Sequence, residues 1–165
     1  MAITIKRIRL LLAAGLATLA FGCGNDTGKD QAQPGSLVTI SPATVDWDAD
    51  VLFGPATQLQ HYVINFAGPG GGPQRNTQVQ VFLDLSTGTT TIPILALFDA
   101  GGTAQTSPFV TSTDDFGNIA VAVQFPVGAG TAFKATLQAF SGGSFGNSTL
   151  TVTCSDANAL DAITC

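Results

Sequence analysis

After residue 36 the chain shows short runs in which apolar and polar residues alternate, separated by Gly, Pro, Asn and Asp. Such alternation predicts β-strands with one buried side, because successive side chains of a strand point to opposite faces of its sheet. Seven segments show it strongly: Leu37–Ser41, His61–Phe66, Gln78–Leu85, Thr91–Phe98, Asn118–Phe125, Ala132–Phe140 and Ser148–Cys154. A weaker candidate is Phe109–Thr113, and no part of this region has convincing helical periodicity.

One-sided strands belong to antiparallel sheets, and two such sheets are stable when their apolar faces pack together. The region 37–165 has 129 residues, which suits one domain. About seven strands in about 100 residues is typical of an immunoglobulin-like sandwich. The sequence therefore predicts an all-β protein, an immunoglobulin-like antiparallel β-sandwich of about seven to eight strands.

The N-terminus has the pattern of an export signal. Lys6, Arg7 and Arg9 precede a nearly unbroken apolar run of 13 residues, 10–22, and small residues stand near its end. A membrane-spanning helix needs about 20 apolar residues, so this run is too short to be one. A basic start followed by a short apolar centre indicates a secretory signal peptide, which we assign to residues 1–22.

The signal ends in the sequence LAFGC, residues 19–23. It resembles the bacterial lipobox, in which a small residue precedes a cysteine that is lipidated and becomes the new N-terminus. The resemblance implies lipidation of Cys23 and attachment to the membrane through acyl chains, and Gly24 after it implies the outer membrane or cell surface. The alternative is ordinary cleavage, which would leave Cys23 as a free thiol. The polar, glycine-containing residues that follow predict a lipidated N-terminus and flexible tether at 23–36.

Three cysteines in an exported protein leave one unpaired. If Cys23 carries lipid, Cys154 and Cys165 remain as a pair, and an oxidising exterior favours a disulfide between them. We expect this bridge to close the C-terminal tail of the domain at 37–165. The alternative is two reduced cysteines and a frayed tail.

The charge of the mature chain limits its partners. Without residues 1–22 the chain keeps only Lys29, Arg75 and Lys134 against eleven aspartates, a formal net charge of −8. Nucleic-acid binding depends on Lys and Arg that neutralise phosphates, so we expect no nucleic-acid partner. The same charge argues against electrostatic adhesion to anionic lipid.

The segment TSTDDFGNIAVAVQF, residues 111–125, places Thr113, Asp114 and Gly117 in a turn just before an alternating strand. Asp hydrogen-bonds backbone within tight turns, and Gly accepts a positive φ. This arrangement resembles the bacterial Ig-like domains of the invasin and intimin (Big-1) type. The resemblance implies a domain without catalytic residues. We therefore expect a lipid-anchored, non-catalytic module of the envelope or cell surface that serves protein interaction, adhesion or envelope structure, with another envelope or surface protein as its partner.

An acidic segment is the best candidate for a ligand site. Asp46, Asp48 and Asp50 alternate, so in an extended segment their carboxylates lie on one side, and calcium prefers clustered oxygen ligands. This calcium site is the only cofactor that the sequence suggests. The alternative is a solvated acidic edge that discourages aggregation between sheets.

Carbohydrate binding and catalysis are weaker interpretations. Trp47, Tyr62 and Phe116 could line a sugar-binding platform, or Trp47 and Tyr62 could pack at the rim of the sandwich. His61 is the single histidine and glutamate is absent, so no acid, base and nucleophile set is visible and we expect no enzyme.

Overall fold

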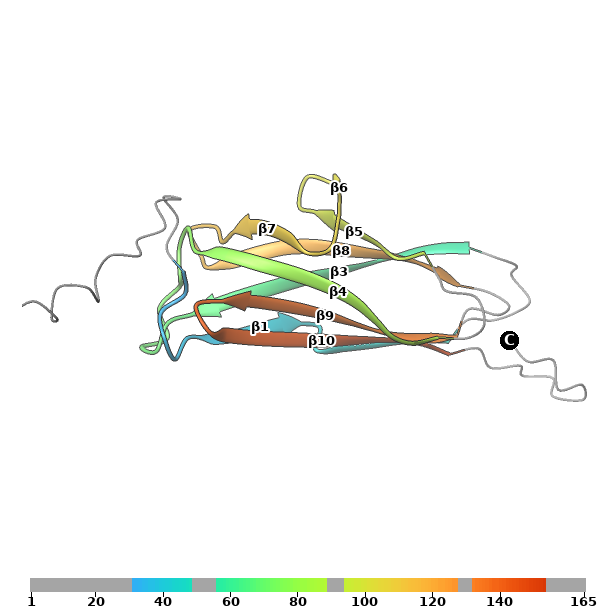
Figure 1. Ribbon diagram of the computed structural model, residues 1–165, viewed down its shortest axis with the longest axis horizontal. Coiled ribbons are helices and arrows are strands. Elements are labelled where there is room, and N and C mark those ends of the chain that lie inside the picture. The colour runs from blue at the N-terminus through green and yellow to red at the C-terminus, as the bar shows by residue number, and fades with distance from the viewer. Residues whose placement is uncertain (1–30, 49–55, 89–93, 128–131, 154–165) are drawn as a thin grey trace, which may run out of the picture.

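The computed structural model describes residues 31–48, 56–88, 94–127 and 132–153, which contain ten β-strands and no helix (Figure 1). The strands are β1 (Leu37–Ser41), β2 (Thr44–Asp48), β3 (Ala56–Ala67), β4 (Gln78–Gly88), β5 (Ala96–Asp99), β6 (Ala104–Gln105), β7 (Phe109–Ser112), β8 (Asn118–Val127), β9 (Phe133–Ser141) and β10 (Ser144–Thr153). Within these described ranges, nothing is both helical and apolar over the length that a bilayer crossing requires.

The strands form two five-stranded sheets that pack face to face. Sheet A has the order β1-β3-β8-β5-β6, and sheet B has the order β2-β10-β9-β4-β7. Neighbouring strands are antiparallel except β2, which runs parallel to β10. In immunoglobulin nomenclature, β1-β3-β8-β5 corresponds to strands A-B-E-D and β10-β9-β4 to G-F-C. The predicted all-β, immunoglobulin-like sandwich is therefore confirmed.

The core lies between the sheets and consists of the apolar positions that the alternation predicts. Ile64 and Phe66 of β3 and Phe125 of β8 are completely buried from the side of sheet A. Val79 and Val81 of β4 are completely buried from the side of sheet B. Burial of this apolar surface is the main stabilising contribution to such a fold.

Two strands were not predicted, and β3 is longer than expected. β2 contains Asp46 and Asp48, but Val45 and Trp47, which alternate with them, turn inward and pack against the core. β3 begins at Ala56 rather than His61, because its first residues pair with the end of β8 from Ala56 opposite Val127 onward. The start of β3 is therefore set by backbone pairing with β8, whereas β2 is also held by its two inward apolar side chains.

Residues 31–36, expected as the end of the tether, lie against the domain. Ala32 is buried, and its N–H donates a hydrogen bond to the Ser141 hydroxyl at 2.9 Å. Gly142 permits this approach, because a Cβ there would lie 1.9 Å from the Ala32 carbonyl oxygen. The last residues before β1 are thus held by the hairpin between β9 and β10.

Tyr62, the single tyrosine, gives the fold a pH dependence on the alkaline side. It is 2% exposed, and this burial raises its pKa from 10.0 to about 12, while a hydrogen bond with Ser148 acts in the opposite direction. The folded state therefore holds the phenol proton more tightly than the unfolded state. The stabilisation is complete below pH 10 and is lost as the pH rises from 10 through about 12.

We therefore expect the unfolding free energy to decrease over this window by at most about 1.4 kcal/mol per pH unit on account of this group. Urea unfolding at stepwise increasing pH measures the decrease. Tyr62→Phe keeps the aromatic ring and removes the titrating hydroxyl. The unfolding free energy of this variant should therefore fall less steeply with pH than that of the unmodified protein. Identical slopes in the two proteins would contradict the assignment to Tyr62.

Candidate interaction site

The outer face of sheet A, here called the neutral face, has no Asp, Lys or Arg among its outward-facing strand residues, and Asp99 stands at the end of β5 beside it. Its outward-facing residues are Leu37, Thr39, Ser41, Thr57, Leu59, His61, Val63, Asn65, Ala96, Phe98, Asn118, Ala120, Ala122, Gln124 and Pro126. By contrast, Asp46, Asp48, Asp84 and Lys134 all point outward from sheet B. In a chain this acidic, a sheet face without a charged residue at its outward strand positions is a distinguishing feature.

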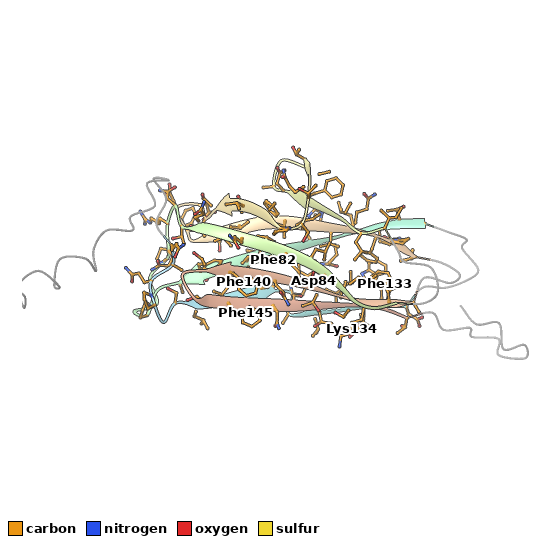
Figure 2. All side chains as sticks on the ribbon, viewed as in Figure 1. Phe82, Asp84, Phe133, Lys134, Phe140 and Phe145 are labelled. Atoms are coloured by element: carbon orange, nitrogen blue, oxygen red, sulfur yellow. The ribbon has the colours of Figure 1, made fainter. Side chains whose placement is uncertain are left out.

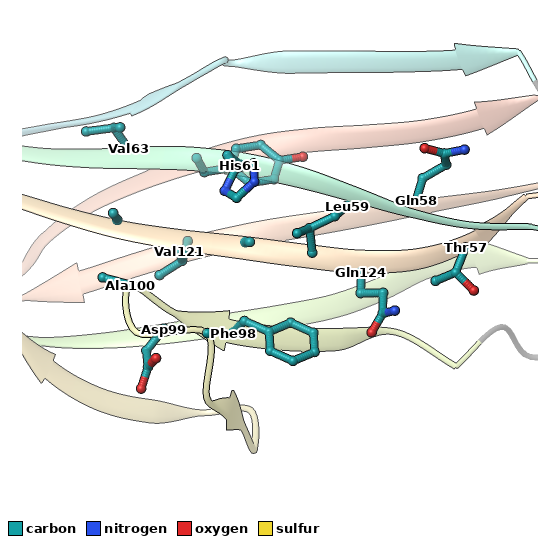
Figure 3. A pocket seen from close by; sticks show the side chains of 14 residues that line it. Thr57, Gln58, Leu59, His61, Val63, Phe98, Asp99, Ala100, Val121 and Gln124 are labelled. Atoms are coloured by element: carbon teal, nitrogen blue, oxygen red, sulfur yellow. The ribbon is translucent and has the colours of Figure 1, made fainter.

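A hollow of about 430 Å³ lies on the neutral face (Figure 3). The alanines of β8 have short side chains, and Ala122 lies directly between His61 of β3 and Phe98 of β5. Longer side chains on both flanking strands therefore rise above the alanines and form the walls. Leu59 and Val63 on the β3 wall are 49% and 45% exposed. The hollow is thus an open, largely apolar groove along β8.

Asp99 fixes the loop that closes one end of the hollow. Its Oδ1 accepts hydrogen bonds from the N–H groups of Gly101 and Thr103, each at 2.9 Å, and its Oδ2 accepts one from Gln105 at 2.8 Å. The Thr103 N–H, together with Gln105 and Gly101, lowers the pKa of this carboxyl group. Asp99 and His61 both line the hollow, but no hydrogen bond joins them. The carboxylate shapes the loop instead of forming an acid–base pair.

The predicted turn residues form the turn that precedes β8. The buried Thr113 hydroxyl accepts a hydrogen bond from the Thr77 N–H at 2.9 Å. Asp114 Oδ1 accepts hydrogen bonds from the N–H groups two and four residues further along, each at 2.8 Å. Gly117 has a φ of +78°. These residues bind the chain's own backbone, so their role here is structural.

Asp46 and Asp48 are exposed on β2, and Asp50 lies outside the described residues. In the described ranges, His, Cys, Asp and Glu nowhere gather in a group of three or more that could hold a metal ion. The calcium site at these three aspartates therefore stays a prediction.

The aromatic residues suggested for a sugar platform are not brought together. Trp47 packs edge-on against Phe125 with ring centroids 5.9 Å apart, and Tyr62 is buried. Phe116 is 73% exposed in the turn before β8. The structure instead brings together Phe82, Phe140 and Phe145, which were not predicted from the sequence, although Phe82 stands at an outward position of an alternating strand.

The three cysteines lie outside the described residues, so the lipidation of Cys23 and the bridge between Cys154 and Cys165 stay predictions.

Fold and site together define an immunoglobulin-like β-sandwich in which the outward strand positions of one sheet are uncharged. No protein-family model matches the chain, and no curated protein matches it. Among solved structures, a conjugative transposon lipoprotein from Bacteroides eggerthii is similar, with 8% identity, a TM-score of 0.48, and coverage of 73% of this chain and 99% of that chain. PapD-like domain 7 of human CEP192 has 16% identity, a TM-score of 0.44, and coverage of 79% and 94%. WR4, an MSP family member of C. elegans, has 9% identity, a TM-score of 0.39, and coverage of 72% and 98%. At these identities and scores the likenesses say nothing about what this chain binds or does.

Proposed function

We propose that the protein is an exported, lipid-anchored, non-catalytic module of the outer membrane or cell surface that binds another envelope protein through the neutral face. The observation that carries this proposal is the contrast between the two sheets. The outer face of sheet B bears acidic side chains, whereas the outward strand positions of sheet A are uncharged and flank the hollow along β8, whose lining includes one carboxylate, Asp99. Protein interfaces are depleted of charge at their centres, and contiguous exposed apolar surface marks interaction sites.

The shape of the hollow supports a protein partner. Its apolar walls, Leu59 and Val63 on one side and Phe98 on the other, are separated by the small side chains of β8. An aliphatic or aromatic side chain of a partner would lose water on both flanks when it entered this groove. Anchor side chains buried in this way supply most of the energy of protein interfaces.

Our assignment of the domain to a type of bacterial Ig-like domain rests on the turn before β8. The backbone hydrogen bonds of Asp114 and the positive φ of Gly117 support a domain of the invasin and intimin type. An adhesive or structural role at the cell surface follows from that resemblance and from the lipobox at Cys23.

Site-specific photocrosslinking in intact cells tests the docking surface. A crosslinking amino acid in place of Leu59 should give a discrete adduct, whereas one in place of Thr151, outward on sheet B, should not. Val63→Lys places a charge on the groove wall and should reduce the Leu59 adduct by about tenfold, since a buried unpaired charge costs more than the about 1.4 kcal/mol that tenfold represents. Val63 is half-exposed, so its substitution should leave the melting temperature nearly unchanged. Equal adducts from positions 59 and 151, or a Leu59 adduct that is unchanged by Val63→Lys, would show that the neutral face is not the docking surface.

Membrane attachment is tested separately by fractionation. We expect Cys23→Ser to move the protein from the membrane fraction to the soluble fraction, because the acyl chains are the proposed anchor. Metabolic labelling with a fatty acid should mark the unmodified protein only. Unchanged membrane retention of the serine variant would refute the anchor and would leave the docking surface to be judged by crosslinking.

A further inference from the structure

Three phenylalanines gather on the opposite side of the sandwich, on the outer face of sheet B (Figure 2). Phe82 of β4 meets the ring of Phe140 of β9 edge-on, with centroids 5.2 Å apart. Phe140 in turn stacks against Phe145 of β10, with centroids 5.1 Å apart. Phe145 is 50% exposed. Cross-strand aromatic contacts of this kind stabilise a sheet, and the half-exposed ring of Phe145 also leaves ring surface available to a ligand.

A polar hollow of about 230 Å³ adjoins the cluster at Phe140. Three glutamines line it, Gln31, Gln78 and Gln80, together with the hairpin residues 141–143. Among the described residues, the side-chain amides of Gln78 and Gln80 form no hydrogen bond. Each amide therefore has two donors and an acceptor available for a ligand.

Hydrogen bonds of Ser141 and the turn between β9 and β10 form the hollow. The buried Ser141 hydroxyl accepts a hydrogen bond from the Ala32 N–H and donates one to the Gln78 carbonyl, so it ties the segment before β1 to β4. Gly142 and Gly143 both have positive φ in the two-residue turn between β9 and β10. Gly142 makes room for Ala32, while a Cβ on Gly143 would meet nothing within 4 Å. The turn thus brings Gln31 to one wall and leaves the entrance open.

We propose that this hollow and the phenylalanine cluster bind a neutral oligosaccharide. Amide groups can hydrogen-bond sugar hydroxyls as donor and acceptor at once, and aromatic rings cover the apolar C–H surface of a sugar ring. At about 230 Å³ the hollow is smaller than the roughly 300–1,000 Å³ of sites for drug-sized ligands, so it suits one sugar unit, with the next unit lying over Phe145.

The uncharged lining of the hollow and the negative charge of the protein favour a neutral glycan over an acidic one. No residue that lines the hollow is charged. Without residues 1–22 the chain has a formal net charge of −8, and no Lys or Arg lines the hollow. A uronate or phosphate-bearing glycan would therefore find no cationic partner in the hollow and would be opposed by the net charge, whereas a neutral glycan would not.

Calorimetric titration of the full mature protein in detergent micelles tests the proposal, with maltohexaose, cellohexaose and chitohexaose as neutral probes and hexagalacturonate as the acidic probe. We expect saturable binding of at least one neutral probe and none of hexagalacturonate. Gln80→Ala and Phe145→Ala should each weaken that binding at least tenfold. Both side chains are exposed, so both variants should stay folded, with the melting temperature unchanged in Gln80→Ala and only slightly lowered in Phe145→Ala by the lost stacking on Phe140.

Two matched controls lie elsewhere on the domain. Phe116→Ala removes an exposed phenylalanine that belongs neither to the cluster nor to the lining of the hollow, and Gln124→Ala removes an amide of the neutral face; neither should change saccharide binding. Absence of binding by all three neutral probes overturns the proposal, as does binding that survives both site substitutions. A change from dimer to monomer in Phe145→Ala, without saccharide binding, also overturns it and assigns the cluster to a contact between copies. None of these results bears on crosslinking at Leu59.

Discussion

Replacing Phe125 with alanine should lower the free energy of unfolding by about 3–5 kcal/mol. Phe125 is completely buried on β8 and links both sheets through its ring. It meets Trp47 of β2 at 5.9 Å and Phe133 of β9 at 6.2 Å, both edge-on. The substitution removes two aromatic contacts, each worth about 0.5–1.5 kcal/mol, and leaves a cavity that surrounding β-strands cannot close.

The single tryptophan makes this loss directly measurable. Because Trp47 touches Phe125, its fluorescence reports both the local change and global unfolding in urea. Phe116→Ala is the matched control, since that ring is exposed and its loss should change the free energy by less than about 0.5 kcal/mol. Similar urea midpoints for the two variants would show that Phe125 does not join the sheets as described.

The alternating pattern predicts the buried half of the molecule well. Val79, Val81 and Phe125 all face inward as their spacing indicates, because a strand whose one side is buried cannot slip by one residue without exposing its core side chains. β1 has the predicted bounds for the same reason. Elements held by backbone pairing alone, such as the two-residue β6, leave no comparable signal.

The outward-facing half is harder to predict, because a surface site depends on which strands lie side by side. His61, Ala122 and Phe98 meet on the neutral face only because β8 lies between β3 and β5. Those residues are distant in the sequence, and alternation says nothing about strand order. The same holds for Phe82, Phe140 and Phe145, which come from three strands. In contrast, the turn of Asp114 and Gly117 is local, so its chemistry could be predicted directly.

The two exposed faces differ in the chemistry they offer. The neutral face presents aliphatic walls around a floor of small side chains, which favours insertion of a partner's side chain. The outer face of sheet B presents rings beside unpaired amides, which favours a ligand with alternating apolar and hydroxyl surface. Since the faces lie on opposite sides of one sandwich, the proposed protein partner and the proposed glycan would not compete for the same surface.

Replacement of Gly117 should also lower the free energy of unfolding strongly, because the backbone conformation and the surroundings of this residue both exclude a side chain. It has a φ of +78°, and a Cβ there would lie 2.6 Å from the Phe66 carbonyl oxygen and 3.1 Å from the Gln74 nitrogen. The Gly117 carbonyl also accepts a hydrogen bond from the Phe66 N–H at 2.8 Å. A side chain would therefore push apart the backbone contact that joins the turn to β3.

We expect Gly117→Ala to destabilise the domain by about 3 kcal/mol, of which about 1–2 kcal/mol comes from the left-handed conformation and the rest from backbone overlap. Gly71→Ala separates the two contributions, because Gly71 has a φ of +80° but a Cβ there would meet nothing within 4 Å. That variant should lose only the conformational part, about 1 kcal/mol. Urea unfolding of both variants measures the difference. Equal losses would mean that the turn moves away from β3 at little cost, and the close packing of this turn would then have no part in stabilising the sandwich.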